Sequence, residues 1–327
     1  MRGNVCPSLR SPRIYASVVT LTVLSTVIPV ILGGMAAPIP VVVLAMAVVV
    51  TGIPHGAVDH LVAAELFDLR FTWRDQLRFY GTYLLLMGIY AVSWIVAPQE
   101  SLVFFLLLTM YHFGQADLAY WDLPPLRARV TYLSRGLFLI GLPIVAFPGV
   151  VTPLFHAIGG MGLREVLDGG IHGPLFVGGL VAQHGLVLGV NAILSDVERM
   201  DVSREMLSVG VLGALFSLVH PLLAFAVYFG LWHSLGHILE LTCFFRRRGT
   251  GPSTLSNFYK KAALFSVLSF AGLGALYALT GSLGVEEQMV AYLFVLIAVL
   301  TLPHVIVVEA MYWARTNRFA DALDGAD

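Results

Sequence analysis

Long apolar blocks recur along the whole chain and constrain its fold more than any other feature. Of the 327 residues, 58% are hydrophobic and only 12% are charged, whereas a soluble domain carries about a quarter charged residues. The apolar residues come in blocks of roughly 20, the length that crosses a bilayer as a helix. The sequence therefore predicts an all-α, polytopic transmembrane helical bundle, located as a multi-pass protein in the cell membrane.

We expect about ten spans. The 40 residues from Met206 to Phe245 are too long for one span, and Pro221 cannot continue a helical hydrogen-bond ladder, so the chain is expected to break at His220-Pro221. Residues 148–173 are expected to form an outer interfacial loop with a short helix. The ten blocks cover residues 15–33, 38–60, 79–97, 101–120, 131–147, 174–194, 206–220, 221–245, 262–280 and 289–313.

The distribution of basic residues gives the predicted orientation. With ten spans, nearly every lysine and arginine falls on one side of the membrane, and basic loops mark the cytoplasmic side. Both termini are therefore expected in the cytoplasm. The first block is interpreted as a retained span rather than a cleaved signal peptide. The predicted organisation is a cytoplasmic tail over residues 1–13, a single transmembrane helical domain over 14–313, and a second cytoplasmic tail over 314–327.

Four of the expected spans carry histidine at a similar depth. His55, His112, the pair His233 and His237, and His304 fall within a layer roughly 8 Å thick. His233 and His237 are four residues apart and share one helix face. Ionisable groups in a membrane are costly unless they face a cavity, a partner or a metal. We therefore predict a metal site at His55, His112, His233 and His237, for which imidazole donors favour Fe, Cu or Zn.

Supporting residues are also predicted around this site. A metal-bound imidazole usually donates its other N–H to a carboxylate or carbonyl, so Asp59 and Asp117 are candidates for that role. His60 lies about 140° around the helix from His55 and is expected either to support the site or to pack between helices. His304 is a candidate ligand, supporting residue or pocket residue.

The other histidines and the nearby aromatic residues are expected to have structural roles or to line an apolar pocket. His184 and His220 are expected to be hydrogen-bonded packing residues, and His156 and His172 to be solvated in the outer loop. Aromatic residues near the predicted ligands are as readily core residues as the walls of an apolar pocket; they are Phe113, Tyr228, Phe229 and Trp232.

The spacing of the two cysteines and the absence of nucleotide-binding motifs argue against a thiolate metal site and against nucleic-acid binding. Cys6 and Cys243 are far apart and in no metal-ligand spacing, so neither a disulfide nor a thiolate site is expected. The sequence contains no Walker loop and no nucleic-acid-binding motif, so nucleic acid is not an expected partner.

Several motifs spread over about residues 50–310 resemble the Brp/Blh family of membrane β-carotene 15,15′-dioxygenases. They are Gly52-Ile53-Pro54-His55-Gly56-Ala57-Val58-Asp59-His60, Tyr111-His112-Phe113-Gly114-Gln115-Ala116-Asp117, His220-Pro221, Trp232-His233-Ser234-Leu235-Gly236-His237 and Leu302-Pro303-His304. Together these motifs are specific, although any one alone is weak.

The resemblance implies a non-haem Fe(II) centre whose four ligands are His55, His112, His233 and His237. It implies that O2 cleaves the central double bond of β-carotene, giving two molecules of all-trans-retinal. Such an enzyme draws its substrate from the lipid bilayer and supplies retinal to a rhodopsin apoprotein.

Two rival functions are weighed against this interpretation. A di-iron desaturase or hydroxylase typically needs about eight clustered histidines, whereas this chain has one His-x-x-x-His pair and no His-His doublet, which disfavours it. A membrane carotenoid- or retinal-binding protein or transporter would use the same polar residues without cleavage. Product analysis separates it from an enzyme, because a binder returns intact carotene.

Overall fold

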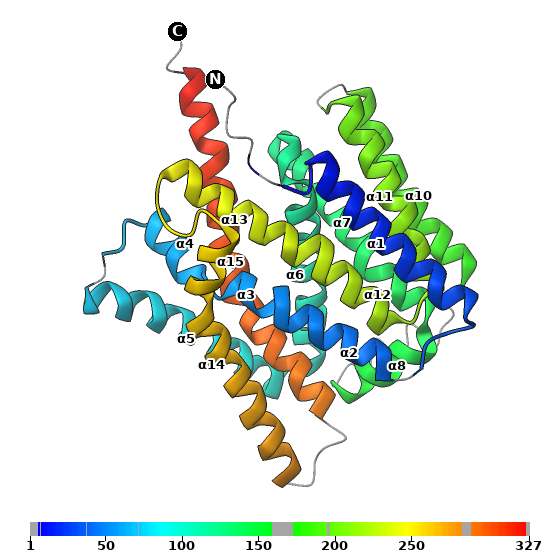
Figure 1. The fold of residues 1–327 in the computed structure, drawn as a ribbon, viewed down its shortest axis with the longest axis horizontal. Coiled ribbons are helices and arrows are strands. Elements are labelled where there is room, and N and C mark those ends of the chain that lie inside the picture. Colours follow the sequence, from blue (N-terminus) through cyan, green and yellow to red (C-terminus); the bar gives the residue numbers. More distant parts are fainter. Residues whose placement is uncertain are drawn as a thin grey trace. The chain divides into compact units, whose positions relative to one another are not determined.

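The computed structural model describes residues 6, 8–36, 38–70, 72–158, 173–194, 197–282 and 289–324, and these ranges contain helices but no strand (Figure 1). Nine helices within them are long and apolar enough to cross a membrane. The predicted all-helical class is therefore confirmed. Of the predicted outer loop, residues 148–157 form the short helix α8 (Pro148–Ala157), and residues 159–172, with His172, lie outside the described residues.

Seven helices begin at a proline, which fits the first turn because its missing N–H has no intrahelical partner there. In chain order the helices are α1 (Pro12–Ile31), α2 (Pro38–Ala47), η1 (Val48–Gly52), α3 (Ile53–Gly56), α4 (Asp59–Leu66), α5 (Trp73–Val96), α6 (Pro98–Leu118), η2 (Ala119–Trp121), α7 (Pro125–Ala146), α8 (Pro148–Ala157), α10 (Pro174–Ile193), α11 (Arg199–Leu218), α12 (Pro221–Val227), η3 (Tyr228–Ser234), α13 (Leu235–Arg248), α14 (Leu255–Ser282) and α15 (Met289–Asp324).

The expected break before Pro221 is confirmed. Helix α11 ends at Leu218 and α12 begins at Pro221, and the Leu222 N–H donates to Nδ1 of His220, 3.4 Å away. Helix α11 is not one of the nine apolar helices, because its first two turns carry charged residues. The prediction of ten spans counted only the apolar part of α11, from Met206 onward.

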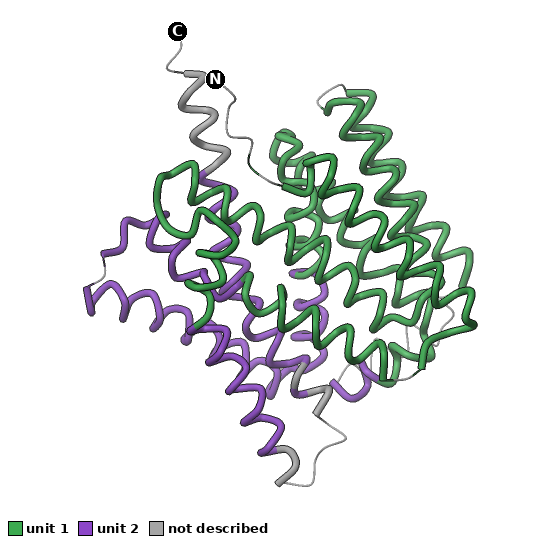
Figure 2. The backbone as a smooth tube through the Cα atoms, viewed as in Figure 1, with its two compact units in different colours: residues 1–55, 109–153, 165–263 green, residues 56–108, 154–164, 264–327 purple. Residues whose placement is uncertain are grey.

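The chain divides into two compact units whose segments alternate along the sequence (Figure 2). Unit 1 comprises residues 1–55, 109–153 and 165–263. Within it, α7 packs against α10 and α11, α1 packs against α11, and α12 packs against α2. Unit 2 comprises residues 56–108, 154–164 and 264–327, and within it α15 packs against α4 and α5.

The interior of unit 1 is a continuous apolar core. Phe138 and Leu142 of α7 pack with Leu212 and Phe216 of α11, and all four are at most 1% exposed. Between helices in a membrane, such side chains stabilise unit 1 through van der Waals packing. The same core extends to η3, the segment that carries His233.

The expectation that the cysteines stay unpaired is wrong. Cys6 and Cys243 form a disulfide within unit 1, although 237 residues separate them in the sequence. Near this disulfide, the Leu9 side chain also lies against Gly236 of α13. Sequence distance gave no sign of this pairing, because it arises from tertiary packing.

Candidate metal centre

Two π-helical segments of unit 1 carry or precede predicted ligands. The segments η1 and η3 pack against each other. His55 lies in α3, directly after η1, His233 lies within η3, and His237 lies on the first turn of α13. A π-helical turn shifts the hydrogen-bond register by one residue and re-aims the side chains that follow, and such turns are frequent at functional sites.

Glycine allows the two π-helical segments to approach closely. A Cβ on Gly52 would lie 2.6 Å from Cε1 of Phe229, and a Cβ on Gly230 would lie 2.9 Å from Cβ of Ala47. The Thr51 hydroxyl donates across this contact to the carbonyl of Gly230 at 3.2 Å. A larger residue at 52 would therefore displace the Phe229 ring, and one at 230 would press on Ala47, next to the segment that leads to His55.

The four predicted ligands come together in unit 1. The ring centroids of His55 and His233 are 5.3 Å apart, those of His55 and His237 are 5.7 Å apart, and those of His112 and His233 are 5.0 Å apart. Their exposure runs from 1% for His112 to 7% for His55. The structure thus places four imidazoles from three separate stretches of the chain in one buried cluster.

Nδ1 of His55 is hydrogen-bonded to the carbonyl of Gly52. A carbonyl oxygen can only accept, so in the neutral ring Nδ1 carries the proton and Nε2 keeps its lone pair. This is the arrangement that a ligating imidazole needs, with its second N–H fixed by a backbone acceptor. The supporting group of His55 is therefore a carbonyl one turn earlier in its own helix.

His112 is brought to the cluster by a close crossing of α6 and α7. A Cβ on Gly114 would lie 1.8 Å from the carbonyl oxygen of Tyr132, and a Cβ on Gly136 would lie 1.7 Å from that of Met110. Only glycine permits backbones to meet this closely, as at small-residue helix contacts in membranes. The crossing fixes the depth and direction of His112.

The donor set fits a transition metal. Four neutral imidazoles without thiolates suit Fe, Cu or Zn and leave coordination positions open. Within the described ranges, no group of three or more His, Cys, Asp or Glu side chains is already spaced to hold a metal ion. The adjacency of the rings and the hydrogen bond of His55 are therefore the observations that favour a metal here.

Two of the predicted pocket aromatics lie next to the cluster, and a third packs against one of them. The ring of Phe113 lies 4.4 Å from that of His233, Phe229 stacks on His233 at 5.7 Å, and Tyr228 lies 5.5 Å from Phe113. Trp232 instead donates its indole N–H to the Thr22 hydroxyl of α1 at 2.9 Å. The apolar side of the cluster is thus formed by Phe113 and Phe229, with Tyr228 behind Phe113.

The residues predicted to support the site contact different partners. In unit 2, Asp59 accepts hydrogen bonds from Nδ1 of His304 and from the Tyr83 hydroxyl, each at 3.0 Å. His60, also in unit 2, lies 4.6 Å from Phe265, ring to ring. Asp59 thus orients the imidazole of His304, and His60 contacts an aromatic ring.

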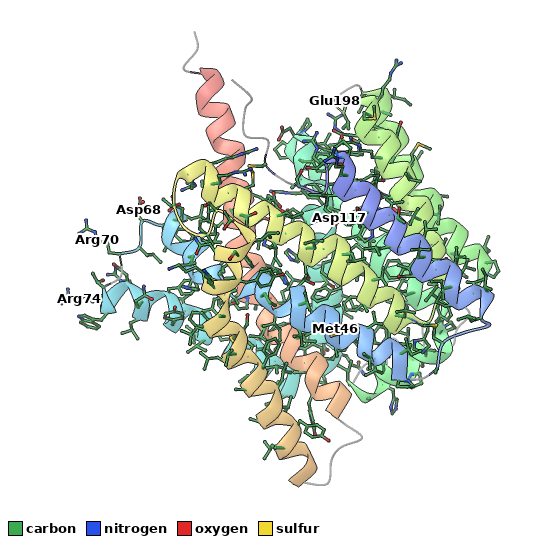
Figure 3. The ribbon with its side chains drawn as sticks, viewed as in Figure 1. Met46, Asp68, Arg70, Arg74, Asp117 and Glu198 are labelled. Atoms are coloured by element: carbon green, nitrogen blue, oxygen red, sulfur yellow. A yellow bond between two sulfur atoms is a disulfide. The ribbon has the colours of Figure 1, made fainter. Side chains whose placement is uncertain are left out.

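Asp117 of α6 (labelled in Figure 3) belongs to a buried charged cluster that the sequence analysis missed. Nε of Arg135 lies 3.1 Å from Oδ2 of Asp117, and Nη1 lies 2.6 Å from Oε1 of Glu205. Nε2 of His184 lies 3.3 Å from the same Glu205 oxygen, and its Nδ1 lies 2.9 Å from the Ser134 hydroxyl. His184 is therefore a hydrogen-bonded packing residue, as predicted, but its partner is a carboxylate.

A signal for this cluster was present in the sequence. Arg135 stands alone inside the apolar block at 131–147, and an arginine at that depth needs an anionic partner. Its partners Asp117 and Glu205 lie on α6 and α11, so only the packing of three helices reveals the cluster.

Two further histidines were predicted to have roles outside the metal site. His156 is exposed on α8, and His220 caps the N-terminus of α12.

Fold and site together define a class of protein: a polytopic helical membrane protein with a buried cluster of four histidines beside an apolar wall. Comparison with known proteins then gives the family. The family model described as β-carotene 15,15′-dioxygenase matches residues 46–312, and this chain therefore belongs to that family. The match contains all four histidines of the cluster.

Two curated relatives agree with the family assignment. The chain is 32% identical over 288 residues to the probable β-carotene 15,15′-dioxygenase Blh of Halobacterium salinarum, covering 80% of this chain and 81% of that protein. It is 26% identical over 280 residues to the β-carotene 15,15′-dioxygenase of uncultured marine bacterium 66A03, covering 83% and 94%. No solved structure matches.

Proposed function

We propose that this chain cleaves the central 15,15′ double bond of β-carotene with O2, giving two molecules of all-trans-retinal that can serve a rhodopsin apoprotein. The single observation that carries the proposal is the buried cluster of His55, His112, His233 and His237 in a chain of this family. We further propose that it does so in the cell membrane, with ten spans and both termini in the cytoplasm.

The four imidazoles would hold Fe(II) through ring nitrogens and leave positions open. The ion, when bound, supplies the redox chemistry that allows O2 to react with the polyene. The overall balance is simple: the double bond breaks, and each of its two carbons takes one oxygen atom. No proton has to enter or leave, so the protein needs no general acid or base for the net reaction.

The apolar residues of the chain would bind and orient the substrate. β-Carotene dissolves in the bilayer and carries no polar group, so it can enter between helices without crossing water. Phe113 and Phe229, beside His233, supply apolar surface against which the polyene can lie. The contacts of Trp232 with α1 make it a support of this wall. The supporting roles of Asp59, His60 and His304 stay predictions.

The proposal is tested by single histidine substitutions in purified protein. His55→Ala and His233→Ala should each lose bound iron and retinal formation, because each removes a donor from the cluster. His156→Ala is the matched control, since His156 is exposed on α8 and should leave both quantities unchanged. Full iron content and full activity in either cluster variant would refute the assignment. A wild-type protein that returns intact β-carotene would instead be a carotenoid binder.

A further inference from the structure

The buried charged cluster makes one contact with the apolar wall of the candidate centre. The hydroxyl of Tyr228 donates to Oδ2 of Asp117 at 3.3 Å, and this same oxygen is the one that Nε of Arg135 contacts at 3.1 Å. Tyr228 is 1% exposed. The polar end of Tyr228 therefore contacts the charged cluster, and its ring packs 5.5 Å from that of Phe113, which in turn lies 4.4 Å from the His233 ring.

We propose that Asp117 is a positioning residue for the cleavage reaction: held by Arg135, it fixes the Tyr228 ring and, through it, the Phe113 ring beside His233. The inference rests on the proposed function and adds to it the group that sets which bond of the polyene lies at the histidine cluster. Asp117 acts through Tyr228 and does not itself contact the reacting atoms.

The chemistry of the substrate explains why such an anchor is needed. A hydrocarbon polyene offers no polar group for recognition, so its register along the pocket depends on the shape of the apolar wall. A phenyl ring alone has no directional bond to hold it, whereas the Tyr228 hydroxyl donates to the Asp117 carboxylate. The hydroxyl that makes this hydrogen bond is at the end of the ring, and the ring itself packs against Phe113 and Phe216.

The charged cluster is also built to keep that anchor rigid. Asp117 lies on α6 and Arg135 on α7, and Arg135 is in turn held by Glu205 of α11, which also contacts His184 of α10. Arg135 presents two nitrogens in a fixed planar fork to its two carboxylates. Because the net reaction exchanges no proton, a role for this carboxylate as an acid or base is not required.

The test compares two conservative variants with a matched control. Tyr228→Phe removes the hydroxyl and keeps the ring, and Asp117→Asn keeps the shape of the carboxylate and removes its charge. Tyr90→Phe is the control, because Tyr90 is also a buried tyrosine, whose hydroxyl donates to the Ser101 carbonyl at 3.1 Å in unit 2. Each purified variant is assayed for thermal unfolding, for kcat and KM, and for the ratio of retinal to longer apocarotenals.

We expect Tyr228→Phe and Asp117→Asn to lose about three- to tenfold in kcat/KM, the size of one hydrogen bond, and to form more apocarotenals by off-centre cleavage. Tyr90→Phe should keep the product ratio of the wild type. Unchanged kcat/KM and unchanged product ratio in a folded Tyr228→Phe or Asp117→Asn protein would overturn the proposal. If one variant fails to fold, the other decides.

A second readout separates this inference from the proposed function. β-Carotene is added to metal-free protein, and the shift of its visible absorption band is recorded. Tyr228→Phe should change the band position or weaken binding relative to the wild type and to Tyr90→Phe, even if the wild type cleaves nothing. Identical spectra and affinities for all three proteins would contradict the positioning role, whatever the outcome of the cleavage assay.

Discussion

Replacing Gly136 by alanine should disturb the candidate centre from a distance, through the crossing of α6 and α7. The added Cβ would lie 1.7 Å from the carbonyl oxygen of Met110, whereas real Cβ contacts are not shorter than 3.0 Å, so the helices must separate by at least 1.3 Å. The obstacle is backbone, which cannot rotate away as a side chain can. His112 lies two residues after Met110 and must move with it.

The size of the effect follows from this displacement. Forcing an extra carbon into a packed interior costs about 1–3 kcal/mol, only partly offset by the better helix propensity of alanine, worth about 1 kcal/mol over glycine. A misplacement of about 1 Å in a catalytic arrangement can lower the rate about 100-fold. The loss of retinal formation should therefore exceed what the loss of stability alone explains.

Gly141→Ala is the matched control on the same helix. Its added Cβ would lie 3.3 Å from Cδ1 of Leu180, the far end of a flexible side chain that can shift. Both variants are purified in detergent, and the thermal midpoint, the iron content and the rate of retinal formation are measured. Gly141→Ala should match or exceed the wild-type midpoint. If Gly136→Ala equals Gly141→Ala in midpoint and rate, the crossing does not position His112.

Three further outcomes are expected. Arg135→Gln should lower the free energy of unfolding by about 3–5 kcal/mol, because it leaves two buried carboxylates without their cation. Glu205→Gln should lower it by less in the same denaturation assay. Equal losses of stability in the two variants would contradict the role given to the Arg135 charge. Gly230→Ala should reduce retinal formation, because its Cβ would meet Ala47 at 2.9 Å; wild-type rates would show that the π-helical segments tolerate separation. A non-reducing digest should yield one peptide pair linked through Cys243; recovery of that cysteine as a free thiol would refute the disulfide.

The helical class and the grouping of the histidines were predictable from the sequence. Apolar blocks of spanning length report helices directly, and Pro221 marked the break between α11 and α12 because proline cannot donate to the ladder. The four imidazoles could be brought together by counting residues from the helix ends, since helices that cross the same bilayer place equal counts at equal depth.

Other features depend on packing that no local pattern reports. The π-helical register at Val48–Gly52 and Tyr228–Ser234 changes one hydrogen bond per turn and leaves no compositional trace. The function of Gly114 at a helix crossing becomes visible only when the facing backbone is known. Arg135 was conspicuous in the sequence, but its partners come from two other helices.

The assignment of a supporting carboxylate shows the same limit. Asp59 follows a turn at residues 57–58, which separates α3 from α4. The carboxylate of Asp59 accepts a hydrogen bond from His304, far along the chain, and Nδ1 of His55 is hydrogen-bonded to the Gly52 carbonyl. The partner of Asp59 is 245 residues away in the sequence, so no local pattern identifies it.

The most direct test of the account is the stoichiometry of the purified, iron-loaded protein acting on β-carotene. We expect two molecules of retinal to form for each β-carotene and each O2 consumed. A His112→Ala variant that folds normally should form no retinal. Intact β-carotene after incubation with folded, iron-containing wild-type protein would contradict the account.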